Sequence, residues 1–135
     1  MKIVFAALLI LLLASCDIDV NHSSYANLSE ANGKTWLPDV LPPSTINIRE
    51  TTNVDLNDAN GEFHFSPNEA PQLFSKLTPN TPTHEHFVGW KDTVNDYLKE
   101  GRTAWSFRDE YSEWAFFCTA KTGQCDFYMW PRHKV

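Results

Sequence analysis

The sequence lacks the short motifs that identify common enzyme classes. It contains no Gly-x-Ser-x-Gly, no Ser-x-x-Lys and no Cys-x-x-Cys pattern, so familiar hydrolase and redox signatures are absent. Basic residues are also scarce, since 11 Lys and Arg face 17 Asp and Glu and the formal net charge is −6. This balance argues against nucleic acid and against adhesion to anionic lipid as partners. We expect a non-enzymatic chain without a cofactor.

The first fifteen residues have the composition of a secretory signal peptide. Lys2 is followed by the apolar run Ile3–Leu13 and then by the small residues Ala14 and Ser15. This run is shorter than the roughly 20 apolar residues that a membrane-spanning helix needs. An uncut membrane anchor and a plain cleaved secretory signal are therefore the weaker alternatives.

The tetrapeptide Leu13-Ala14-Ser15-Cys16 resembles the lipobox of bacterial lipoproteins. The resemblance implies cleavage before Cys16, acylation of that cysteine and a lipid anchor facing the periplasm. Asp17 follows directly, and an aspartate at this place favours retention in the inner membrane in enterobacterial lipoproteins. The expected location is therefore the bacterial envelope, at the inner rather than the outer membrane.

Three regions are predicted along the chain. Residues 1–15 form the signal peptide, residues 16–35 the lipidated N-terminus and a flexible tether, and residues 36–135 one small periplasmic domain. The tether is predicted because this stretch is polar, rich in Ser and Asn, and without apolar periodicity. Loss of Lys2 with the signal peptide changes the formal net charge to −7.

The predicted domain is α+β, an antiparallel sheet of about five short strands with two helices packed on one face. Alternating or aromatic-rich segments predict strands at residues 45–50, 62–65, 103–107, 112–120 and 124–130. The pair Asn60-Gly61 predicts the turn of the first hairpin. Apolar spacing predicts helices over residues 70–77 and 87–98.

The two remaining cysteines predict a disulfide. Cys118 and Cys125 flank a six-residue turn that contains Gly123, so they fall nearly opposite each other on adjacent strands. An oxidising compartment favours their bond. A redox or metal pair is the alternative, but no second cysteine pair supports it.

The tripeptide His84-Glu85-His86 is the nearest approach to a metal cluster. On a strand, His84 and His86 would share one face and could chelate one ion, with His64 or His133 as a third ligand. A small metal-binding protein or hydrolase that uses His84 and His86 is therefore the alternative function. A solvated polar loop explains the same residues more simply.

The last two predicted strands carry apolar side chains on both faces. Either the helices and the proline-rich segment cover both faces, or one aromatic patch stays open. In the second case Trp105, Tyr128 and Trp130 would form an interaction surface.

A second likeness extends into the domain. Residues 41–48 and 61–67 resemble a group of small uncharacterised bacterial proteins with a proline-led strand, a polar turn and an aromatic strand. The whole chain is similar to small lipoproteins of enterobacterial prophages and envelope islands. This likeness implies a binding module for another envelope protein, in envelope stress or phage exclusion. A structural subunit of an envelope complex is a further alternative.

Overall fold

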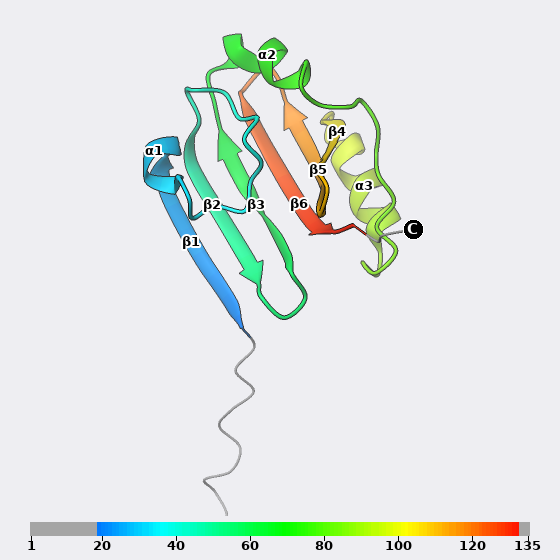
Figure 1. Cartoon of the computed structure of the whole chain (residues 1–135). Helices are drawn as coiled ribbons and strands as arrows, with labels where there is room; N and C mark the ends of the chain where they lie inside the picture. The colour runs from blue at the N-terminus through cyan, green and yellow to red at the C-terminus, as the bar shows by residue number, and fades with distance from the viewer. Residues whose placement is uncertain (1–18, 133–135) are drawn as a thin grey trace, which may run out of the picture.

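The computed structural model of the protein describes residues 19–132. Its framework is one antiparallel sheet of six strands, in the order β1-β2-β3-β6-β5-β4 (Figure 1). The strands are β1 (Val20–Asn27), β2 (Ile46–Asn53), β3 (Asp58–His64), β4 (Thr103–Arg108), β5 (Ser112–Thr119) and β6 (Gln124–Pro131). The α+β class is therefore confirmed, with one strand more than the five expected.

The additional strand, β1, lies within residues 16–35, which were expected to be a flexible tether. It pairs with β2 along its length, and the short helix α1 (Leu28–Ala31) follows it directly. Tyr25 is the one large side chain that β1 packs against the core. A strand held mainly by backbone pairing leaves little apolar periodicity, which is why the tether prediction is wrong for residues 20–31.

The helices lie on opposite faces of the sheet, so the prediction that both share one face is wrong. The turn η1 (Pro67–Glu69) leads into α2 (Ala70–Phe74), which buries Leu73 in the larger core. The longer helix α3 (Trp90–Lys99) buries Trp90 against the other face. Each face of β5 and β6 is apolar and therefore needs its own cover. Within residues 19–132, no helix is long and apolar enough to cross a membrane.

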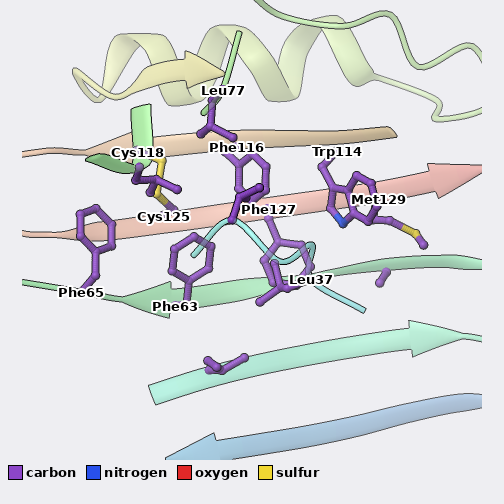
Figure 2. Packing of buried hydrophobic residues seen from close by; sticks show 14 of the residues in the cluster. Leu37, Phe63, Phe65, Leu77, Trp114, Phe116, Cys118, Cys125, Phe127 and Met129 are labelled. Carbon is purple, nitrogen blue, oxygen red and sulfur yellow. A yellow bond between two sulfur atoms is a disulfide. The ribbon is translucent and has the colours of Figure 1, made fainter. Parts of the chain in front are cut away.

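The larger core is built on aromatic side chains from the central strands (Figure 2). Phe63, Phe116 and Phe127 have no solvent exposure, and Phe63 packs edge-on against Phe116 at 6.1 Å between ring centroids. Leu37, from the proline-rich segment before β2, covers these rings. Both faces are thus covered, the first of the two alternatives left open by the sequence.

A buried carboxylate fixes this proline-rich segment to the sheet. Glu50 of β2 is 4 % exposed and accepts hydrogen bonds from Thr35 Oγ1 at 2.9 Å and from the Trp36 amide at 3.2 Å. Burial raises the pKa of Glu50 above its ordinary value, and these two hydrogen bonds oppose that rise. Trp114 of β5 in turn donates its Nε1 to the Trp36 carbonyl at 3.1 Å.

The β2–β3 turn is not at Asn60-Gly61, as the sequence predicted. The hairpin turns at residues 54–57, where Asn57 has a φ of 53°, and Asn60-Gly61 lies inside β3. A Cβ on Gly61 would overlap the carbonyl oxygen of Arg49 on β2. Glycine is needed here for a close approach of two backbones, not for a turn.

The predicted disulfide between Cys118 and Cys125 is confirmed. The two residues are paired across β5 and β6, and Gly123 in the connecting turn has a φ of 66°. The bond closes the hairpin next to Phe63 and Phe116 in the larger core (Figure 2).

Candidate functional site

One end of the sheet brings several turns together. Val20 at the start of β1 pairs with Asn53 at the end of β2, and Ser112 at the start of β5 pairs with Pro131 at the end of β6. The β2–β3 turn, the β4–β5 turn and the last residue of β6 therefore lie at the same end as the first residue of β1 (Figure 1). We name this region the Val20 end.

Most of the large hydrophobic side chains that stay exposed within residues 19–132 gather at the Val20 end. They are Val20, Val54, Leu56, Val88 and Tyr111. Val88 is 97 % exposed and Leu56 is 64 % exposed. Ile46 and Leu98, which are also exposed, lie at the opposite end. These five side chains come from separate turns and strand ends along one end of the sheet, which makes this end the candidate interaction region.

A pocket of about 330 Å³ opens at this end next to Leu56, with a mostly apolar lining. Its lining residues are Leu56, Asp58, His84, His86, Phe87, Trp130 and Pro131. Trp130 is 5 % exposed, and its ring stacks on the His84 imidazole at 4.1 Å between centroids. The fold thus brings His84, His86 and Trp130, which the sequence analysis had singled out, into one place.

The pocket is supported by a second aromatic cluster on the face that α3 covers. Trp90 meets Trp130 edge-on at 5.5 Å and donates its Nε1 to the Pro82 carbonyl at 2.9 Å. Tyr97 stacks on Phe117 at 4.3 Å. These contacts fix the loop before α3 to the sheet, so the pocket wall is held by packed rings.

His84 is held in a weakly solvated position. Its ring lies against Phe87 and Trp90 as well as Trp130, and its Nδ1 is buried without a hydrogen-bond partner within the described chain. Burial lowers the pKa of His84, and the nearby charge of His86 lowers it further. Asp58, the first residue of β3, lines the same pocket, and burial raises the pKa of its carboxyl group. The neutral imidazole is therefore the form that fits this site.

Acidification should weaken the fold through His84. Because the folded-state pKa lies below the usual value of 6.5, the unfolded chain binds this proton more readily. Stability is then complete above about pH 6.5 and falls as the pH drops toward the folded pKa. The urea midpoint of the wild type should fall more between pH 7.5 and pH 5 than that of His84→Phe, whose ring does not titrate. Equal changes in both proteins would contradict this assignment.

Trp105, Tyr128 and Trp130 do not form one surface. Trp105 pairs with Phe116 and Tyr128 pairs with Ala115, and neighbouring residues of a strand point to opposite faces. Trp105 accordingly stacks on Phe74 of α2, with 4.4 Å between ring centroids. The predicted interaction surface built from all three is therefore wrong, because strand alternation places Trp105 on one face and Tyr128 and Trp130 on the other.

The metal alternative gains no support from the geometry. Within residues 19–132 no group of three or more His, Cys, Asp or Glu side chains is placed to hold a metal ion. His84 and His86 do line one pocket, but the lining contains no serine, cysteine or lysine that could act as a nucleophile. Cys16, Asp17 and His133 lie outside the described residues.

Acidic groups surround the Val20 end. The charged groups there are the carboxylates of Asp19, Asp55, Asp58, Glu85, Asp109 and Glu110, against the cationic groups of Lys91, Arg108 and Arg132. The arrangement is therefore suited to an apolar group that carries a positive charge beside it. The contributions of Leu56, Phe87 and Val88 were missed from the sequence. An apolar residue inside a polar turn, as in Asn53-Val54-Asp55-Leu56, was the available signal.

Comparison with known proteins gives one partial match. Residues 17–64 match the family model described as the YbbD head domain. This stretch is less than half of the chain and includes β1, α1, β2 and β3. No curated protein and no solved structure matches the chain.

Proposed function

We propose that the chain is a lipid-anchored, non-enzymatic binding domain of the bacterial envelope that engages a partner protein through the Val20 end. The carrying observation is that Leu56 lines an apolar pocket and stays exposed, as do Val54 in the same turn and Val88 beside the lining residue Phe87. Cys16 is the proposed lipid attachment site, and Asp17 favours the inner membrane.

The short distance along the chain between Cys16 and the sheet supports this assignment. Only Asp17, Ile18 and Asp19 separate Cys16 from the first residue of β1. At 3.3–3.6 Å per residue, this connection reaches at most about 14 Å. A domain anchored at Cys16 would therefore keep its Val20 end close to the membrane surface, where a membrane-embedded partner is accessible.

The charge of the Val20 end favours a protein over the bilayer itself. Asp55 and Asp58 flank Leu56, and Glu85 precedes Phe87 and Val88 by only two or three residues. Anionic lipid headgroups would be repelled by these carboxylates. A protein segment with apolar and basic side chains satisfies both features of the surface.

The test is site-specific photo-cross-linking in intact cells, with a photoreactive residue at Leu56 or Val88 of the full-length protein. We expect adducts with a membrane protein at both positions, because both side chains are exposed at the proposed interface. The adducts should be lost in Cys16→Ala exported with an ordinary signal peptide, which should also release the domain into the soluble periplasm.

The matched control positions are Ile46 and Leu98, which are exposed at the opposite end. Equal adducts at both ends, adducts with lipid alone, or no adduct at Leu56 and Val88 would reject the proposed interface. Membrane retention of the Cys16→Ala protein would reject the anchor separately.

A further inference from the structure

The two edges of the sheet differ in how they are protected. At the β4 edge, Ser106 exchanges both of its backbone hydrogen bonds with Thr78, at 2.8 Å each, so the middle of that edge is closed. At the other edge, β1 is the terminal strand and pairs with β2 alone among the described strands. Within residues 19–132, this edge of the sheet is therefore open.

The backbone groups that face this open edge can be identified from two hydrogen bonds. The Asp19 carbonyl accepts from the Val54 amide at 3.1 Å, so residue 19 points inward. The Ala26 amide donates to the Glu30 carboxylate at 2.7 Å, so residue 26 points outward. Direction alternates along a strand, and Val20, His22 and Ser24 consequently direct their N–H and C=O groups outward.

The exposed edge lacks the usual protection against pairing. Natural edge strands carry lysine, proline, inward charges or bulges, whereas β1 reads VNHSSYAN and contains no lysine, proline or carboxylate. His22 is held against β2 by a 2.9 Å contact between its Nδ1 and Thr51 Oγ1. Glu30 occupies the Ala26 amide, which limits the available edge to residues 20–24.

We propose that residues 20–24 of β1 accept an extended segment of the partner protein as a seventh strand. This inference rests on the proposed function, because Val20 belongs both to this edge and to the Val20 end. A partner segment bound at the Val20 end can therefore continue along β1 without a break. Main-chain hydrogen bonds supply affinity in this mode of recognition.

A second copy of the chain is a poorer occupant of the same edge. Self-pairing would join two short strands whose side chains at residues 21–24 are polar. Such a contact falls well short of the roughly 1,200 Å² that a stable interface buries. A partner that also covers the apolar surface at Leu56 and Val88 can reach that area.

The test is hydrogen exchange of the full-length protein, compared between native envelope membranes and purified protein in detergent. The inward amides of residues 21, 23 and 25 are protected in both samples by the β2 ladder. We expect the outward amides of Val20, His22 and Ser24 to gain at least tenfold protection in the membranes only. No gain would overturn the inference, whether or not the cross-links at Leu56 and Val88 form.

Ser24→Pro is the decisive variant. It removes an outward N–H that the fold does not use, so the urea midpoint should stay nearly unchanged. Protection at Val20 and His22 should be lost, and the cross-link yield at Leu56 should fall at least tenfold, whereas Ser24→Ala should behave as wild type. If the Ser24→Pro protein still cross-links at Leu56 with the wild-type yield, the added strand is rejected. The proposed function, which depends on the cross-link itself, is not contradicted by that result. Protection already present in purified protein of dimeric mass would identify a second copy instead.

Discussion

Trp130→Ala should lower the free energy of unfolding by about 3–5 kcal/mol, the range for a large aromatic removed from a core. Trp130 is 5 % exposed and contacts both His84 and Trp90. Its removal leaves a cavity between the sheet and the loop before α3. The loss is a large part of the 5–15 kcal/mol typical of a whole domain, and urea denaturation monitored by circular dichroism measures it.

Two controls separate packing from surface effects in this experiment. Trp130→Phe retains a ring and should cost less than Trp130→Ala. Val88→Ala changes a side chain that is 97 % exposed and should stay within about 0.5 kcal/mol of wild type. A Trp130→Ala protein as stable as wild type would mean that this ring belongs to an open interface, and the pocket described at the Val20 end would then be wrong.

Gly61→Ala should destabilise the fold by about 3 kcal/mol, at the upper end of what overpacking costs. The added methyl group would overlap the carbonyl oxygen of Arg49 and come within 2.8 Å of the Glu50 Cα, and both are backbone atoms. Backbone atoms cannot rotate away as a side chain can, so the methyl group fits only if β2 moves away from β3. The urea midpoint should fall, with the largest gain in amide exchange along the β2–β3 ladder.

Asn60→Ala is the matched control for Gly61→Ala, because Asn60 is the exposed neighbour in the same strand. It should change stability by no more than about 0.5 kcal/mol. If Gly61→Ala were equally mild, the close approach of β2 and β3 at this position would be disproved. The result would then be compatible with a turn at residues 60 and 61, as the sequence alone predicts.

These expectations separate the residues that stabilise the domain from those proposed to bind. Trp130 and Gly61 are structural, whereas Leu56 and Val88 are exposed and can be changed at little cost in stability. A loss of cross-linking after substitution of Leu56 or Val88 would therefore report on the interface and not on the fold.

Local patterns in the sequence determined a substantial part of this fold. The strands of the C-terminal half are dense in aromatic residues, and the spacing of Cys118 and Cys125 around a turn allowed their disulfide to be predicted. These features depend on residues close together in the chain, so they can be recognised without knowledge of the tertiary structure. The α+β class followed from the same local patterns.

Tertiary structure decided what depends on contacts between distant segments. β1 is a strand because β2 offers it a backbone ladder, although its own residues are mostly polar. Gly61 is a strand residue because Arg49 approaches it from another strand. Trp130 and Trp105 are equally aromatic in the sequence, yet strand alternation and the two covering helices place them on opposite faces. Burial is a property of the assembled chain, so residue types alone could not show that Leu56 and Val88 stay exposed while Trp130 is buried.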